Sequence, residues 1–458
     1  MKRRARTVIV LWTALLVLCT VAASAQALDS TKRVLPNGLT VLTVERTNLP
    51  VVMVSLLIQA SQLNEERKQA GVAYLTGKML TEGTQKRTAK AISEEIEFIG
   101  ASLDISTTPD FTIVSLSVLK KDAEKGFDIL SDVLLHPSFP EDELKRKKDL
   151  IKGSLRQKEE EPSYVAEKAF IREVFGTLPY GLPVEGTTQT IDALSRSDVT
   201  GFYRAYYLPS RATLSIVGDL TKAEVDSLIA RYFGEWKAGE PPAAGVGAED
   251  QGKTTALRGP KVVEIQKDIT QANIIVGHGG ISRENPDYYA VSVMNYIFGG
   301  GGFASRLMKT VRDDMGLVYS IYSTFVPYKE PGYFQVEAQT KNESAVTVIG
   351  EILSQMHRMK TEMVSDEELK DAKSYLTGSF PRRLETSRKI ADFLTAVEFY
   401  RLGDDYVEKY PGYINAVTRE DVLRVAKKYL DDARYVLVAV GNRELMKLSE
   451  LKLPEEVH

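Results

Sequence analysis

The chain has 458 residues, 43% of them hydrophobic and 26% charged, with a formal net charge of −3 at pH 7. Residues 1–27 carry four basic and no acidic side chains, so the rest of the chain has a net charge of −3 − 4 = −7, which argues against nucleic acid as a partner. The only cysteine, Cys19, lies within that segment, and this excludes disulfides and thiol nucleophiles from the remainder.

The N-terminal segment has the features of a secretory signal peptide. Basic residues between Lys2 and Arg6 precede an apolar run from Val8 to Ala23, and small residues at Ala23 and Ala25 offer a cleavage site. The apolar run is shorter than the roughly 20 residues that span a bilayer. We therefore expect residues 1–27 to be removed, with no stable membrane anchor, and the protein to be exported to the periplasm of a Gram-negative bacterium.

Strand and helix patterns alternate irregularly along the next 200 residues, roughly the size of one domain. Apolar alternation and β-branched residues predict strands, and apolar residues at helical spacing predict helices. The predicted strands are 33–44, 51–59 and 111–119, and the predicted helices are 69–81, 89–99, 141–158 and 164–175.

A linker rich in Gly, Pro and Ala covers residues 239–260 and has few residues that could be buried. It separates a first domain, 28–238, from a second, 261–458. The second domain repeats the mixed pattern, with predicted strands at 272–278, 320–326 and 333–339 and predicted helices at 287–298, 345–359 and 366–378. Strands interspersed with helical pairs indicate α+β domains with largely antiparallel sheets.

The two domains share a repeat. Residues 198–218 and 421–441 align without a gap, with seven identities in 21 positions, and each reads as a helix, a short turn and an apolar strand that ends at Gly. A match of this length favours duplication of a whole domain. A chance match between two helix–strand units is the alternative.

A set of ordered motifs resembles the pitrilysin/insulinase (inverzincin) family of metallopeptidases, in its bacterial two-domain form. The motifs are Gly71–Thr84, His136–Pro140, Pro179–Thr187, Phe298–Gly302 and Gly316–Ser320. The resemblance covers both domains and implies two homologous domains, each a mostly antiparallel sheet packed with helices, as in mitochondrial processing peptidase.

The resemblance also implies a zinc site whose residues are replaced in this chain. The two ligand histidines of the family correspond to Tyr74 and Lys78, the general base to Gly77, and the distal glutamate ligand to Ser154. A phenol ionises near pH 10, and an ammonium repels a dication. We expect this chain to bind no metal or other cofactor. Lys78 then either takes the place of the metal, bonded to a carboxylate such as Glu82, or faces solvent.

In the second domain the family pattern is retained. The resemblance implies that Arg312 and Tyr319 project into the peptidase chamber, where the tyrosine hydroxyl stabilises the oxyanion and the guanidinium holds the substrate backbone. The alternative is an ordinary salt bridge from Arg312 to Asp313 or Asp314, with Tyr319 packed in a strand. The resemblance further implies that four glycines form a mobile rim of the chamber: Gly299, Gly300, Gly301 and Gly302. The alternative, a phosphate-binding loop, would need Gly-Lys-Ser/Thr at the helix start, and no lysine stands there.

These observations predict the non-catalytic subunit of a heteromeric zinc peptidase, which closes a peptide-binding chamber and lends Arg312 and Tyr319 to a homologous, zinc-bearing partner. The resemblance also implies that a peptide substrate is held as a strand added at a sheet edge, near residues 320–326. Two alternatives remain open. One is a peptide-binding or structural scaffold without peptidase activity, and the other is an independent hydrolase that uses unrecognised residues.

Overall fold

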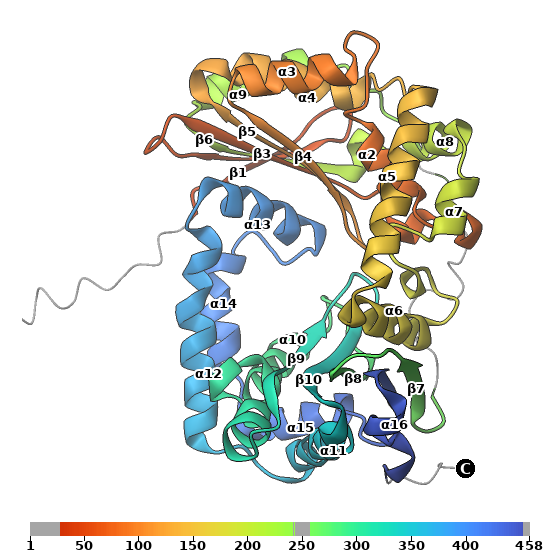
Figure 1. Ribbon diagram of the computed structural model, residues 1–458. Helices are drawn as coiled ribbons and strands as arrows, with labels where there is room; N and C mark the ends of the chain where they lie inside the picture. The colour runs from red at the N-terminus through yellow and green to blue at the C-terminus, as the bar shows by residue number, and fades with distance from the viewer. Residues whose placement is uncertain (1–27, 241, 243–256, 452–458) are drawn as a thin grey trace, which may run out of the picture.

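The computed structural model describes residues 28–240, 242 and 257–451, which form two helix-covered β-sheets (Figure 1). The predicted signal peptide and most of the predicted linker lie outside the described residues. No helix of the described part is long and apolar enough to cross a membrane.

The first sheet has six strands in the order β1-β2-β6-β3-β5-β4, and the pair β2–β6 is its only parallel pair. Its central strands consist of apolar and β-branched residues, which suit a sheet that is covered on both faces. The strands are β1 (Thr31–Val34), β2 (Thr40–Glu45), β3 (Val51–Ile58), β4 (Ser102–Thr107), β5 (Thr112–Leu119) and β6 (Ala212–Gly218).

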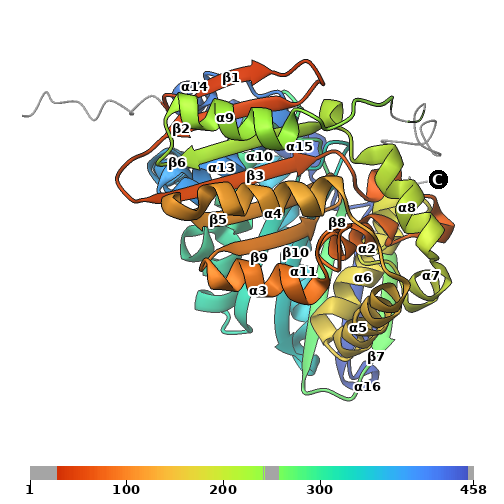
Figure 2. The same ribbon diagram turned by 90° about the horizontal axis from the view of Figure 1, so that it is seen from above.

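Helices α3, α4 and α9 lie over one face of this sheet, and α2, α5, α7 and α8 gather at one end of it (Figure 2). The α-helices of the first half are α2 (Val72–Met79), α3 (Ala89–Phe98), α4 (Ala123–Leu135), α5 (Glu141–Glu159), α6 (Pro162–Phe175), α7 (Thr188–Ala193), α8 (Arg196–Tyr206) and α9 (Lys222–Phe233).

The second sheet, ordered β7-β11-β8-β10-β9, repeats the first one without β1. As in the first sheet, one pair, β7–β11, is parallel. The strands are β7 (Lys261–Gln266), β8 (Gln271–Gly279), β9 (Val318–Val326), β10 (Tyr333–Lys341) and β11 (Val436–Gly441). The α+β architecture predicted from the sequence is therefore confirmed.

The helices of the second half cover its sheet and extend toward the first half. The predicted helix 287–298 ends as an α-helix at Asn295, and a wider π-helical turn continues to Gly300. The helices are α10 (Tyr288–Asn295), η6 (Tyr296–Gly300), η8 (Met308–Asp314), α11 (Ala345–Thr361), α12 (Asp366–Ser379), α13 (Ser387–Phe399), α14 (Tyr406–Asn415), α15 (Arg419–Tyr429) and α16 (Arg443–Met446).

The repeated segments found in the sequence occupy equivalent places. Strand β6 lies between its parallel partner β2 and β3, and β11 lies in the same way between its parallel partner β7 and β8. Each follows a helix that begins with a capping box. The repeated aspartates are the third residues of these helices, where Asp198 pairs with Ser195 and Asp421 with Thr418. Their identity in the repeat thus reflects the same helix start in both halves.

The two halves exchange one helix each. Helix α6 of the first half packs on β8 and β11 of the second sheet, and α13 of the second half packs on β3 and β6 of the first (Figure 1). Apolar residues fill both contacts: Ala166, Phe170 and Val174 meet Ile275, Val436 and Val438, while Ile390, Ala391 and Leu394 meet Leu42 and Val217. Each sheet therefore depends on the other half for part of its cover.

A buried carboxylate also joins the halves. Asp110, in the turn between β4 and β5, is 5% exposed and accepts hydrogen bonds from the Tyr180 hydroxyl (2.5 Å), the Tyr400 hydroxyl (3.0 Å) and the Lys329 backbone N–H (2.9 Å). Burial raises the pKa of Asp110, and the three donors oppose that rise. The turn is thereby tied to α13 and to the β9–β10 loop.

Candidate functional site

Helix α2 carries three of the four positions that correspond to the zinc site, and its start is fixed by the buried carboxyl group of Glu65. Glu65 accepts the backbone N–H of Gly71 at 2.9 Å and that of Ala73 at 2.8 Å. These two amides would otherwise be unpaired at the helix N-terminus. Gly71 has φ +92°, a left-handed conformation that glycine adopts without strain.

The side chains of Tyr74 and Lys78 lie together on the half-buried face of α2. The Lys78 ammonium is 5.4 Å from the centre of the Tyr74 ring and donates to the Ile105 carbonyl at 2.9 Å. Burial lowers the pKa of Lys78, with a further contribution from Lys147, and burial raises the pKa of Tyr74. Neither change in pKa produces a zinc ligand at neutral pH. The phenol stays protonated, and the Lys78 side chain is hydrogen-bonded to a backbone carbonyl of β4.

Gly77 faces the sheet, where a side chain would fit only if its neighbours moved slightly. A Cβ atom there would lie 3.0 Å from the Thr107 hydroxyl and 3.3 Å from Ile105. From the sequence, this position is expected only to lack the general base. The structure adds a packing reason for glycine, which is the close approach of α2 to β4.

Ser154 is exposed on α5, one residue before the buried Leu155. Helix α5 contacts α2, but no hydrogen bond joins Ser154 to Tyr74 or Lys78 within the described residues. The described residues also contain no group of three His, Cys, Asp or Glu side chains placed to hold a metal ion.

The suggested pairing of Lys78 with Glu82 is wrong. Glu82 is 7% exposed and forms ion pairs with Arg146 and, at 2.5 Å, with Lys147, both on α5. A buried carboxylate so paired ties α5 to the segment that follows α2. Lys78 instead bonds a backbone carbonyl of β4, as described above.

Arg312 and Tyr319 are brought together in the second half. The Arg312 guanidinium lies 5.3 Å from the centre of the Tyr319 ring and 4.7 Å from that of Phe303. Tyr319 is 80% exposed and Phe303 is 69% exposed. Arg312 forms no ion pair within the described residues, so the expected alternative, a salt bridge to Asp313 or Asp314, is not observed.

The glycine run lies beside this pair. Gly299 is packed so closely that a Cβ atom would come within 2.5 Å of the Ser323 hydroxyl, and Gly302 has φ +57°. Glycine is therefore required at both ends of the run, for close packing at the first and for a left-handed turn at the last. The run ends at Phe303, which stacks on Arg312. Its role as the rim of a chamber stays a prediction.

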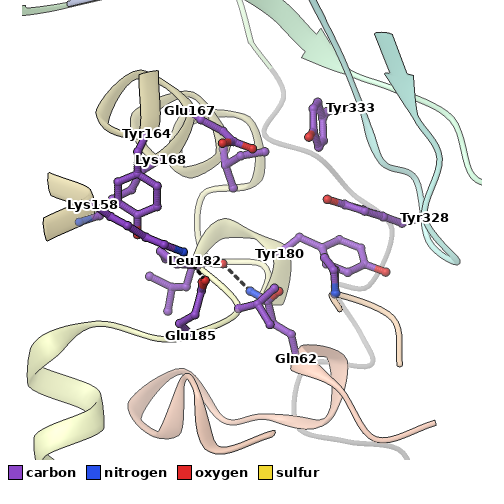
Figure 3. Close-up of a pocket in the computed structure, with 14 residues that line it drawn as sticks. Gln62, Lys158, Tyr164, Glu167, Lys168, Tyr180, Leu182, Glu185, Tyr328 and Tyr333 are labelled. Carbon is purple, nitrogen blue, oxygen red and sulfur yellow. Dashed lines mark hydrogen bonds and ion pairs between the residues drawn. The ribbon is translucent and has the colours of Figure 1, made fainter. Parts of the chain in front are cut away.

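A cavity of about 290 Å³ between the two halves was not predicted from the sequence (Figure 3). Tyr180 and Tyr164 come from the first half, and Tyr328 and Tyr333 from the second. Lys158 and Glu185 form an ion pair across its wall at 2.7 Å. Tyr180 and Glu185 belong to the motif 179–187, but nothing in that motif indicated a cavity. The reason is that Tyr328 and Tyr333 come from the β9–β10 loop and the start of β10, far along the chain.

Glu167 points into the same cavity from α6 (Figure 3). Burial raises the pKa of its carboxyl, and the neighbouring Glu337 and Glu185 raise it further. The Tyr164 hydroxyl is buried and has no hydrogen-bond partner within the described residues. The cavity thus combines aromatic walls with the ionisable side chains of Lys158, Glu167 and Glu185.

The fold is that of a protein with two similar halves, each a mostly antiparallel sheet covered by helices. Residues 40–188 match the family described as Insulinase (Peptidase family M16). Residues 193–376 match the family described as Peptidase M16 inactive domain. The chain belongs to the M16 peptidase family, and it is a homologue of that family's zinc proteases.

Related proteins of several organisms resemble the chain over most of its length. It is 24% identical to an uncharacterized zinc protease of Bacillus subtilis, over 77% of this chain and 83% of that protein. It is 26% identical to a probable mitochondrial-processing peptidase subunit beta of Arabidopsis thaliana, over 89% and 77%. A Pseudomonas fluorescens structure described as a peptidase M16 inactive domain superposes with a TM-score of 0.83, at 27% identity, over 91% of this chain and 98% of that one.

Proposed function

We propose that this chain is the non-catalytic subunit of a heteromeric zinc peptidase. In this proposal it closes a peptide-binding chamber and contributes Arg312 and Tyr319 to the zinc site of a homologous partner. The observation that carries the proposal is the exposed pair itself: Tyr319 is 80% exposed, and Arg312 lies beside it without a carboxylate partner in the described residues.

The chemistry of the pair supports a role at a reacting carbonyl. An exposed tyrosine hydroxyl can donate to an oxyanion, and a guanidinium without an ion-pair partner can hold a substrate carbonyl. Stacking on Phe303 and Tyr319 orients the guanidinium without using its N–H donors.

The zinc-site positions support the absence of a metal in this chain. Zinc in peptidases is held by imidazole and carboxylate ligands. Tyr74 and Lys78 offer a phenol and an ammonium, Gly77 offers no side chain, and Ser154 is exposed. We therefore propose that zinc is bound by the partner alone.

We also propose that residues 1–27 direct export and that the mature chain works in the periplasm. The basic start, the short apolar run and the small residues at Ala23 and Ala25 support this reading. N-terminal sequencing of the mature protein tests it, and a chain that retains Met1 would argue against export.

The experiment that tests the function mixes this chain with a zinc-bearing M16 subunit that co-purifies with it. We expect this chain alone to show less turnover than the wild-type mixture. In the mixture, we expect Arg312→Ala and Tyr319→Phe each to lower turnover on the order of 10-fold to 1000-fold. Tyr375→Phe, an exposed tyrosine on α12, is the matched control.

Unchanged turnover in both variants would reject the contribution of the pair. A stable homodimer that captures no zinc-bearing subunit would favour a scaffold without peptidase activity instead.

A further inference from the structure

Strand β4 is one of the two edge strands of the first sheet, and half of its backbone groups face away from β5. In the turn that joins the two strands, the Thr108 N–H donates to the Phe111 carbonyl at 2.8 Å. Antiparallel pairs alternate between hydrogen-bonded and non-hydrogen-bonded along a ladder. Because Thr108 is hydrogen-bonded to its partner and the pattern alternates, Ile105, three residues earlier, forms a non-hydrogen-bonded pair with Val114. The N–H and C=O of Ile105 therefore point away from β5.

The outward carbonyl of Ile105 is already occupied. The Lys78 ammonium reaches from α2 and donates to it at 2.9 Å. Helix α2 contacts β4, so the lysine stem lies along the edge where another strand would add. A charged donor binds a carbonyl more strongly than a peptide N–H does. An incoming peptide would have to displace it.

The second sheet has the same arrangement at its own edge strand, β9. The Asn295 side chain, at the end of α10, donates to the Ser323 carbonyl at 3.2 Å and accepts from the Ser323 hydroxyl at 2.7 Å. Helix α10 follows β8 as α2 follows β3, and it contacts the edge strand in the same way.

The two contacts fall at the same position of the two sheets. The pairing registers can be followed from the repeated strand β6 through β3 to β5, and from β11 through β8 to β10. They place Val114 of β5 at the position that Val336 of β10 holds in the second sheet. The edge partners of these valines are Ile105 and Ser323. The residue whose carbonyl is capped by Lys78 is thus the structural equivalent of the one capped by Asn295.

We propose that Lys78 closes the β4 edge of this chain to extended peptides. Open edges pair readily with other strands, and proteins commonly block them with a lysine. The first sheet would otherwise offer a peptide-binding edge beside α2, where the donor set does not suit a metal. Closure therefore prevents an extended peptide from binding at this edge of the isolated chain. The inference concerns the isolated chain and does not depend on the proposed function.

The test measures peptide binding by the isolated full chain. The probe is a short fluorescein-labelled peptide of alternating Thr and Val, followed by anisotropy. We expect Lys78→Met to bind the probe about tenfold more tightly than the wild type, because one charged hydrogen bond no longer competes. Lys147→Met removes a neighbouring cation that pairs with Glu82, not with the edge, and should bind as the wild type does.

Amide hydrogen exchange locates the bound probe. In Lys78→Met the probe should protect the outward amides of Leu103, Ile105 and Thr107, and thermal unfolding shows whether this variant is folded. Lys78→Ala is a second variant without the donor, and Lys78→Arg should keep the edge closed.

Three results would overturn the proposal. These are no gain in affinity in either donor-free variant, an equal gain in Lys147→Met, or protection that falls outside residues 103–107.

Discussion

The Arg312 guanidinium and the Tyr319 ring are 5.3 Å apart, on elements that are separated by a sharp turn at Gly316. Gly316 has φ +66°, which allows η8 to turn directly into β9. The pair is thus positioned by local chain geometry rather than by burial, since Tyr319 is 80% exposed. A residue held in this way can face a ligand or a partner without serving the stability of its own domain.

The first prediction concerns that separation of stability from function. Tyr319→Ala should change the free energy of unfolding by less than about 0.5 kcal/mol, because an exposed side chain loses few contacts. Urea denaturation of the isolated chain measures this, and Phe98→Ala, at 91% exposure, is a matched control. A loss of about 2 kcal/mol or more would assign Tyr319 to the fold instead.

The second prediction concerns the carboxylate between the halves. Asp110→Asn replaces a carboxyl group that accepts three hydrogen bonds by an amide. The NH₂ group of this amide would face a hydroxyl that is itself a donor. We expect the free energy of unfolding to fall by about 1–3 kcal/mol. Urea denaturation tests this against Asp104→Asn, an exposed carboxylate on β4. Equal effects of the two changes would contradict a special role for Asp110.

The third prediction follows from the exchanged helices. Phe170 of α6 is fully buried against the second sheet, with its ring 5.9 Å from that of Tyr333. Phe170→Ala should therefore lower the free energy of unfolding by about 3–5 kcal/mol. Hydrogen exchange should show faster opening in β8 and β11, although the substitution lies in the first half. Faster exchange confined to the first half would argue that the halves are independent.

The fourth prediction concerns pH. Burial raises the pKa of Glu65 to about 8 from an ordinary value of 4.5, against the two backbone donors. Between these values the folded protein keeps a proton that the unfolded chain has released, so the contribution of Glu65 to stability is complete below pH 4.5 and is lost as pH rises toward about 8.

Glu65→Gln should remove this dependence, because its amide does not titrate. Relative to Glu65→Gln, the wild type should lose on the order of a few kcal/mol of unfolding free energy between pH 5 and pH 8. Urea denaturation at several pH values measures the difference, with Glu94→Gln on exposed α3 as the control. A pH-independent difference would mean that Glu65 is ionised throughout.

Much of the fold could be predicted because its signals are local. Strands such as β3 and β5 have apolar, β-branched runs, and the repeat at residues 198–218 and 421–441 reflects a helix cap and a buried strand in each half. The exchange of α6 and α13 could not be predicted in the same way. An amphipathic helix shows that one face is buried, but not which sheet buries it.

The site shows the same limit. The proximity of Arg312 and Tyr319 was expected, since only seven positions separate them in the chain. The partner of Lys78 was not, because the Ile105 carbonyl has no sequence signature and depends on which backbone groups of β4 face outward. The interdomain cavity likewise depends on Tyr328 and Tyr333, which lie far from the first-half residues that complete it.

The zinc content of the purified, isolated chain tests the central claim most directly. Metal analysis after exposure to excess zinc and removal of weakly bound ions should find far less than one zinc ion per chain, because Tyr74, Gly77, Lys78 and Ser154 do not provide a ligand set. One tightly bound zinc ion per chain, lost on substitution at Tyr74 or Ser154, would contradict the account.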